Sequence, residues 1–417
     1  MVALAAGTGF GGAAKDFFSR HRVSVLSIVL SLVGIATGTA AAAALLQFAS
    51  PAGPLVVAAG ALLAAACCAA QTRHLGLAAM AAAAPLPGLL WAAPLSGGEN
   101  FGAVPILAYA FAFAVAALRA QAAVDRALRD GNEEYPWWAA ACAVGLMAVL
   151  GVLWFWGTGR RDAAMQSVAD VTLAVFSAAV LLPLAASVLH FDENFVARAN
   201  RARERRQRLL ERLAFVALPR WGLSFAGIAL VLLALGWFGA EPAMRTGTGA
   251  AVLRVVSAGL VAVAATFFMR GWREGLATGF AVAVVGLVSL WAVAAGRYDP
   301  MAPVGVIEAA ALAVFLALHS GRRALSYRAR GEAPALARQR TIEETSAGQV
   351  FAAAGALAAV LPAAVLWPAI IPLAVGVVAA GFGGIVWAPA GTAALECLFP
   401  RHRSADELYA THKKSQA

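Results

Sequence analysis

Runs of about twenty apolar residues recur along the whole chain and are separated by shorter polar segments. An α-helix of roughly this length crosses the ~30 Å hydrocarbon core of a bilayer. Hydrophobic residues make up 61% of the chain and charged residues only 13%, whereas a typical soluble domain carries roughly 25% charged residues. A water-soluble fold would have almost no polar surface, so the sequence predicts an all-α membrane protein with many spans.

The apolar runs predict about twelve spans in two sets of six. The first set is expected at 23–47, 54–70, 75–95, 102–118, 137–157 and 165–190. The second set is expected at 221–239, 249–269, 276–295, 302–319, 348–367 and 370–398. Pro85 and Pro87 interrupt the third run, and Pro362 and Pro368 bound the turn between the last two. We therefore divide the chain into a six-helix repeat with a basic linker at 1–213 and a second six-helix repeat at 214–417.

The positions of Lys and Arg predict the orientation of these spans. If the N-terminus is cytoplasmic and the spans alternate, 27 of the 32 Lys and Arg residues fall in cytoplasmic segments. Such an excess is typical of the inner side of a membrane, so we expect a multi-pass protein of the bacterial inner membrane with both termini in the cytoplasm. The formal net charge of +10 is then a topological signal. Nucleic acid is not an expected partner, because the charges lie in loops between apolar runs.

The two halves share a pattern of loop lengths. Each has a short inner loop between its second and third spans, QTRHLG (71–76) and RGWREG (270–275), and a long one after its fourth span, 119–136 and 320–347. Because each half has an even number of spans, the repeats are expected to be parallel. The basic, amphipathic linker at 191–220 is interpreted as a helix on the anionic inner leaflet or as a docking site for a partner.

Three motifs of the second half carry a family resemblance. They are FFMRGWREG (267–275), Asp299-Pro300 before the tenth span, and HSGRRALSYRARGE (319–332) after it. Together with the loop pattern, this part resembles the membrane domain of the resistance-nodulation-division (RND) superfamily, particularly its MmpL-type lipid exporters. The resemblance implies a transporter that exports or handles lipids or other hydrophobic molecules, with membrane lipids and a hydrophobic substrate as its partners.

The chain departs from that family in two respects. RND members insert large extracytoplasmic domains after their first and seventh spans, but here those places hold only 49–53 and 240–250. A separate periplasmic or membrane partner subunit is therefore expected. The family also carries acidic residues in its fourth and tenth spans for proton coupling, whereas the corresponding stretches here, 112–118 and 313–319, contain no acid.

Charged residues inside a membrane are costly and indicate function by default. Glu308 lies early in the tenth predicted span, and His319 follows eleven residues later. At 100° per residue, His319 returns to within about 20° of the same helix face. Glu308, Ala311, Phe315 and His319 thus form one stripe, which is a candidate pathway for protons or substrate. Alternatively, hydrogen bonds hold Glu308 near the outer interface and His319 only marks the cytoplasmic helix end.

Two further charged residues are expected near the outer surface. Asp170 lies early in the sixth predicted span and Arg254 early in the eighth. They are candidates for an ion pair between the halves, although independent snorkelling of each side chain is the alternative. At the opposite end, Glu396 is expected at the inner interface beside Arg401 and Arg403.

The sequence lacks the motifs of an enzyme. We find no nucleophile–base pair, metal-ligand cluster or phosphate-binding loop, and therefore expect no catalysis, no cofactor and no metal. Two alternatives to the transporter stay open. One is a non-transporting lipid-binding scaffold comparable to a sterol-sensing domain. The other is a major-facilitator-type transporter, although the 71–76 loop lacks that family's Gly-rich charged motif.

Overall fold

The computed structural model describes most of the predicted bundle. The described residues are 52–95, 103–129, 139–146, 148–149, 161–188, 195, 197, 199–201, 204–205, 208, 219–243, 271–295, 302–366 and 370–399. All regular structure in these ranges is helical, which confirms the all-α prediction. The number of spans, the repeats and the orientation stay predictions. The spans expected at 23–47 and 249–269, and most of 137–157, lie outside the described residues.

Five helices or helix pairs are long and apolar enough to cross a membrane, counted among the described residues alone. They are Leu75–Ala92, Pro105–Asp125, Trp272–Ala292, Pro334–Leu366 and Ile371–Leu398. Each coincides at least in part with a run of apolar residues that predicted a span. Their length and composition support a membrane location.

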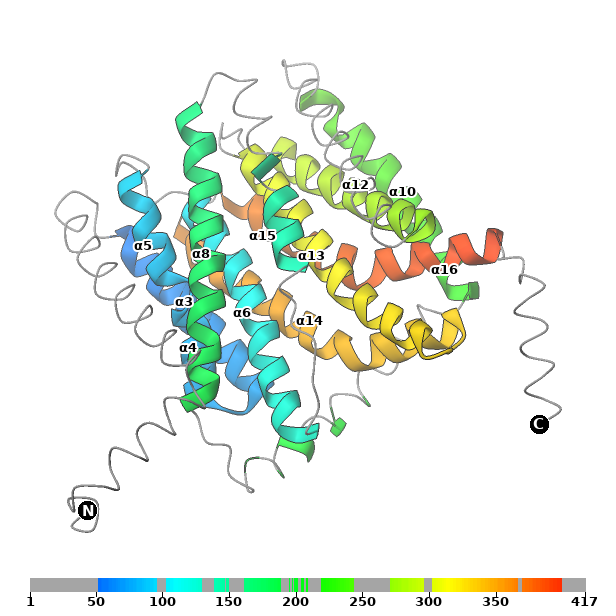
Figure 1. Ribbon diagram of the computed structural model, residues 1–417. Coiled ribbons are helices and arrows are strands. Elements are labelled where there is room, and N and C mark those ends of the chain that lie inside the picture. Colours follow the sequence, from blue (N-terminus) through cyan, green and yellow to red (C-terminus); the bar gives the residue numbers. More distant parts are fainter. Residues whose placement is uncertain are drawn as a thin grey trace, which may run out of the picture.

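The helices of the first half lie at one side of the bundle (Figure 1). They are α3 (Ala52–Thr72), α4 (Leu75–Ala83), α5 (Leu86–Leu95), α6 (Ala103–Arg129) and α8 (Arg161–Val188). The short turn between α3 and α4 places Arg73 at φ 58°. Beside it, the Nδ1 of His74 accepts a hydrogen bond from the Leu77 N–H at 3.1 Å and so caps α4.

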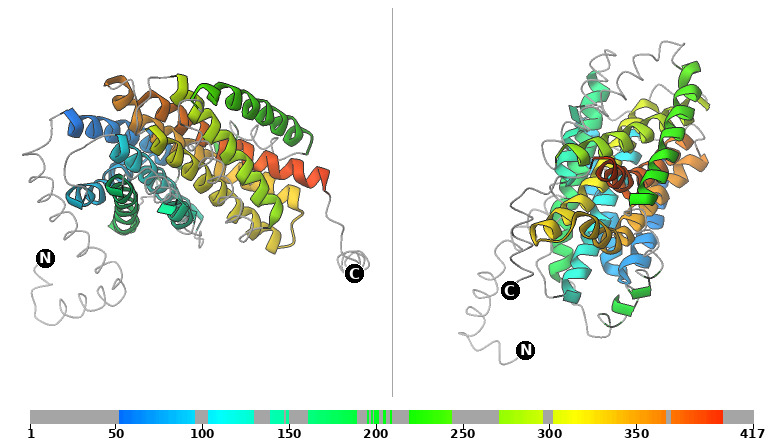
Figure 2. Two further views of the ribbon diagram at one scale, coloured as in Figure 1. Left: turned by 90° about the horizontal axis from the view of Figure 1, so that it is seen from above. Right: turned by 90° about the vertical axis from the view of Figure 1, so that its right-hand side faces the viewer.

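The helices of the second half fill the other side (Figures 1 and 2). They are α10 (Pro219–Ala243), α12 (Trp272–Ala295), α13 (Ala302–Ala329), α14 (Pro334–Leu366), α15 (Ile371–Phe382), the π-helix η5 (Gly383–Trp387) and α16 (Ala388–Leu398). Helix α10 lies along the outer edge against α12 and α16, whereas α14 packs against α3 and α6 of the first half. The two halves therefore meet along α14.

Two helices continue well beyond their predicted spans. The spans expected at 102–118 and 302–319 belong to α6 and α13, which run on to Arg129 and Ala329. These extensions contain charged residues, which lower the local hydropathy. The hydropathy pattern therefore predicted loops where the two helices continue. Likewise, α14 begins at Pro334 rather than near 348 and ends at Leu366.

Of the prolines that were expected to interrupt or bound spans, one lies inside a helix and another breaks its run as expected. Pro362 is within α14 and does not end it, because neighbouring helices can satisfy or shield the carbonyl that a proline leaves without a donor. Pro85 does break the third apolar run, between α4 and α5. At that break, the Tyr109 hydroxyl of α6 donates to the Ala82 carbonyl at 2.7 Å, and Ser177 of α8 donates to the Ala84 carbonyl at 2.5 Å.

Replacement of Tyr109 by Phe is expected to lower the free energy of unfolding by about 1–3 kcal/mol, the range for leaving one buried group without a hydrogen bond. Thermal unfolding of the purified protein measures this change. Ser289→Ala is the matched control, since its buried hydroxyl bonds only to the Val285 carbonyl one turn earlier in the same helix. Equal stability of Tyr109→Phe and the wild type would show that the helix break does not depend on this hydroxyl.

The last predicted span, 370–398, consists of α15, η5 and α16 in succession. In η5 the N–H of Ala388 bonds to the Gly383 carbonyl, five residues earlier. This segment passes very close to its neighbours. A Cβ on Gly383 would lie 2.5 Å from Val285 Cγ2 on α12, and one on Gly384 would lie 2.5 Å from Leu316 Cβ on α13. The pair of glycines thus permits the close approach of three helices.

Candidate functional site

Two buried acidic side chains lie near each other inside the bundle. Asp170 on α8 and Glu308 on α13 are 2% and 3% exposed. The Asp170 carboxylate lies within electrostatic range of Glu308. Both oxygens of Glu308 and the Oδ2 of Asp170 have no hydrogen-bond partner among the described residues. Asp170 and Glu308 are named the carboxyl pair, and none of the ion pairs among the described residues involves either of them.

Helix α6 provides the common support for this pair. It packs against both α8 and α13, and Figure 1 shows it between them. Its residues from 105 to 120 are buried without interruption. Phe111 of α6 contacts Phe315 of α13 with ring centroids 5.8 Å apart. An apolar helix thus holds the two acid-bearing helices together and supplies no described cation beside the pair.

The pair lies toward one end of the bundle. Glu308 is six residues after the start of α13 and Asp170 nine residues after the start of α8, which corresponds to depths of about 9 and 14 Å along the helices at a rise of 1.5 Å per residue. Both helix starts are on the predicted outer side. The carboxyl pair thus lies inside the apolar part of the bundle and close to its predicted outer end.

The predicted stripe on α13 lies on one helix face, but the Phe315 side chain lies between Glu308 and His319. Ala311 and Phe315 are fully buried, and His319 is half-buried. The Phe315 and His319 rings lie 6.5 Å apart. Glu308 and His319 are separated by eleven residues, about 16 Å along the axis, with Phe315 between them. The structure therefore shows a continuous face but no direct contact from Glu308 to His319.

The expected pairing of Asp170 with Arg254 cannot be placed, because Arg254 lies outside the described residues. The approach of Asp170 to Glu308 was missed at the sequence level. A usable signal was present, since these two are isolated acids in otherwise apolar runs. Among the described residues, neither carboxylate oxygen of Glu308 has a hydrogen-bond partner, and the alternative that hydrogen bonds hold Glu308 stays a prediction.

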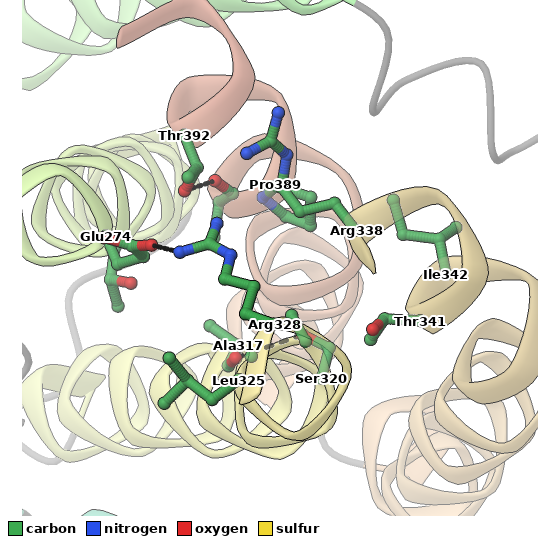
Figure 3. Close-up of a pocket in the computed structure, with 14 residues that line it drawn as sticks. Glu274, Ala317, Ser320, Leu325, Arg328, Arg338, Thr341, Ile342, Pro389 and Thr392 are labelled. Atoms are coloured by element: carbon green, nitrogen blue, oxygen red, sulfur yellow. Dashed lines mark hydrogen bonds and ion pairs between the residues drawn. The ribbon is translucent and has the colours of Figure 1, made fainter. Parts of the chain in front are cut away.

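A second polar site lies where α12, α13, α14 and α16 meet (Figure 3). Arg328 of α13 donates to Glu274 of α12 at 2.7 Å and to Glu396 of α16 at 3.1 Å. Arg338 of α14 pairs with the other oxygen of Glu396. Glu396 was expected to lie beside Arg401 and Arg403, which are outside the described residues. Its observed partners are 68 and 58 positions away in sequence.

These four residues define the arginine–glutamate cluster, and a small pocket opens beside it. Its lining comprises the polar residues Glu274, Thr278, Ser320, Arg328, Arg338, Thr341 and Thr392 and the apolar or small residues Ala317, Gly321, Ala324, Leu325, Ile342, Ala388 and Pro389. Figure 3 shows Arg328 and Arg338 reaching from α13 and α14 toward α16. The cluster ties together helix ends that the charge pattern assigns to the cytoplasmic side.

A further ion pair lies next to this cluster on the same helices. The Nε and Nη2 of Arg323 both donate to Glu344 Oε2, at 3.1 and 3.0 Å. Burial, with a smaller contribution from Glu344, raises the pKa of the Tyr327 hydroxyl above its ordinary value. The contact between Arg323 and Glu344 thus connects the parts of α13 and α14 that extend beyond their predicted spans.

No group of three His, Cys, Asp or Glu residues is arranged to hold a metal ion in the part of the chain that the structure describes. The described cysteines, Cys67, Cys68, Cys142 and Cys397, are all free thiols. The carboxyl pair and the arginine–glutamate cluster are thus the candidate sites in the described part of the chain. In comparisons with known proteins, no family model matches the chain and no curated protein matches its sequence.

Proposed function

We propose that the chain is a proton-coupled transporter of lipids or other hydrophobic molecules in the bacterial inner membrane, with an RND-like arrangement of helices. The observation that carries this proposal is the carboxyl pair. Two acids on different helices, each at least 97% buried and without full hydrogen bonding among the described residues, are expensive to keep in an apolar bundle. Acids in membrane-spanning helices commonly serve as proton relays.

Electrostatics gives the pair a specific role. Removing two ionised carboxylates from water costs several kcal/mol per ion, and like charges close together oppose each other's ionisation. In the conformation described, burial and the neighbouring acid therefore favour a protonated carboxyl group in the pair. Release of that proton requires water or a cation to reach the pair, which needs a rearrangement of α8 or α13. This dependence of protonation on conformation is the basis of coupling.

The substrate class follows from the surroundings of the pair. The residues directly before and after the two acids in the sequence are alanine, valine and isoleucine. The part of α6 that packs against their helices is apolar. Such a bundle offers hydrophobic contacts and few hydrogen bonds to a solute. A polar substrate would find no matching groups here, whereas a lipid or another hydrophobic molecule would.

A non-transporting lipid-binding scaffold is the second candidate. It is favoured by the stretches 112–118 and 313–319, where the resembling family carries its relay acids. Here these stretches are apolar, and all their residues except His319 are fully buried. Tightly packed apolar residues at 112–118 and 313–319 favour a scaffold that does not change conformation over a transporter whose pathway opens and closes.

Transport by the whole chain in proteoliposomes separates the two candidates. The wild-type protein is expected to move a fluorescent phosphatidylglycerol across the bilayer faster when a pH gradient is imposed. Reduction of the exposed label from outside measures this movement. Protein-free liposomes and a pH-equilibrated sample are the controls. Lipid movement that ignores the gradient would exclude proton coupling, and no movement in any condition would favour the scaffold.

A further inference from the structure

The arginine–glutamate cluster contains two arginines and two glutamates, and a third buried arginine lies at the same end of α12. Arg273 of α12 lies on the same helix face as Ala277, which packs against Gly391 of α16. Arg273 is 8% exposed, stacks on Trp272 at 5.2 Å and has no carboxylate partner among the described residues. Arg273 directly precedes Glu274 in the sequence, so the described residues at this end of α12 add one guanidinium group to the two of the cluster. A buried positive charge without a counter-ion is unfavourable, so the site favours an added anion.

The guanidinium groups also retain donors. The Nε of Arg328 and the Nε of Arg338 have no hydrogen-bond partner among the described residues, although both side chains line the pocket. The Arg338 side chain is 6% exposed. Its unused donor is thus more than nine-tenths buried, and bulk water does not compensate it. Arginine donors in this fork geometry match the oxygens of carboxylates and phosphates.

The pocket restricts the anion to a small group. The space in the pocket measures about 50 Å³, room for roughly four water molecules at 10–15 Å³ each. A single phosphate group fits this space, whereas a nucleotide does not. The apolar lining includes Ala317, Ala388 and Leu325, of which Leu325 is 37% exposed. The pocket thus joins an apolar side to a cationic end.

We propose that this pocket binds the phosphate of an anionic lipid headgroup from the inner leaflet. The helix ends that form it lie on the predicted cytoplasmic side, at the depth where headgroups of anionic lipids are concentrated, and basic pockets between helices at this depth bind such headgroups. The phosphate interacts with Arg328 and Arg338, while the acyl chains lie outside the pocket along the bundle. Glu396 bonds the same two arginines and therefore competes with the phosphate.

Binding of short-chain phosphatidylglycerol to the full-length protein in mild detergent tests this proposal without any transport measurement. Native mass spectrometry counts retained lipids, and titration gives the half-saturating concentration. We expect one tightly retained phosphatidylglycerol and weaker retention of phosphatidylcholine. Arg338→Gln is expected to raise the half-saturating concentration at least about tenfold, as for loss of a charge-assisted contact. Arg340→Gln, an exposed neighbour on α14, is the matched control and is expected to leave it unchanged.

Glu396→Gln provides a test of opposite sign. Removal of the competing carboxylate is expected to lower the half-saturating concentration severalfold, even though it breaks two ion pairs and reduces thermal stability. If the cluster only holds the helices together, Arg338→Gln and Glu396→Gln would both reduce thermal stability. Neither would then change lipid binding in the expected direction. Wild-type binding by Arg338→Gln, or unchanged binding by Glu396→Gln, would overturn the proposal. Equal binding of inorganic phosphate would overturn the assignment to a lipid and indicate a site for free phosphate.

Discussion

Transport driven by a pH gradient is expected to fall to the protein-free background in Glu308→Gln, and to fall similarly in Asp170→Asn. Each substitution preserves shape and removes one titrating group of the carboxyl pair. Neither is expected to reduce thermal stability, because an amide does not carry the ionised charge that makes the buried pair costly. The proteoliposome assay with labelled phosphatidylglycerol measures the transport, and thermal unfolding of the same samples measures stability.

Glu343→Gln is the control for this experiment. Glu343 lies on α14 and accepts a hydrogen bond from Gln339 one turn earlier, at 3.0 Å, far along the chain from both acids. Its replacement is expected to leave the gradient-driven rate unchanged. Infrared difference spectra give a substrate-independent readout, because a protonated carboxyl group has its own carbonyl stretch. That band should weaken in Glu308→Gln and Asp170→Asn. Persistence of gradient-driven transport in both variants would remove the carboxyl pair from the mechanism.

Gly60→Ala and Gly88→Ala are each expected to lower the stability of the protein strongly. A Cβ on Gly60 of α3 would lie 2.4 Å from the Ala359 carbonyl oxygen of α14, and one on Gly88 of α5 would lie 2.1 Å from the Leu173 carbonyl oxygen of α8. Both obstacles are backbone atoms of a packed helix, so no side chain can rotate away. Helices in membranes depend on such small residues for close packing.

The expected decrease in the free energy of unfolding is about 1–3 kcal/mol or more for each, the range for overpacking. Denaturant or thermal unfolding of the purified protein measures it. Gly227→Ala is the matched control. It lies in α10, where a Cβ would meet nothing within 4 Å, and alanine favours a helix by about 1 kcal/mol over glycine. A loss in Gly227→Ala equal to that in Gly60→Ala would show that helix contact is not the cause.

Hydropathy was sufficient to predict that the chain is helical and where most described helices lie. It was insufficient for the helix ends. The residues from 320 to 329 include three arginines and look like a loop, yet α13 continues through them. The reason is tertiary, because Arg323 and Arg328 reach Glu344, Glu274 and Glu396 on other helices. Hydropathy averages a segment on its own and does not register partners on neighbouring helices.

The candidate site was predictable by residue but not by pairing. Asp170 and Glu308 are recognisable in the sequence as isolated acids in apolar runs. Their approach depends on how α8 and α13 pack against the two sides of α6, and the apolar pattern does not determine which faces of these helices turn toward one another. The arginine–glutamate cluster was missed for a related reason. Each of its charges lies at a helix end, where an isolated charge ordinarily faces water.

The single π-turn in the last span fixes the direction in which α16 faces. A π-turn accommodates one residue more than an α-turn, and one residue rotates everything after it by about 100° about the helix axis. Glu396 and Thr392 follow this turn and face Arg328, Arg338 and the pocket. Without the extra residue, Glu396 would point about a quarter-turn away from both arginines. The π-turn in η5 thus sets the rotation of α16 that brings Glu396 toward the two arginines.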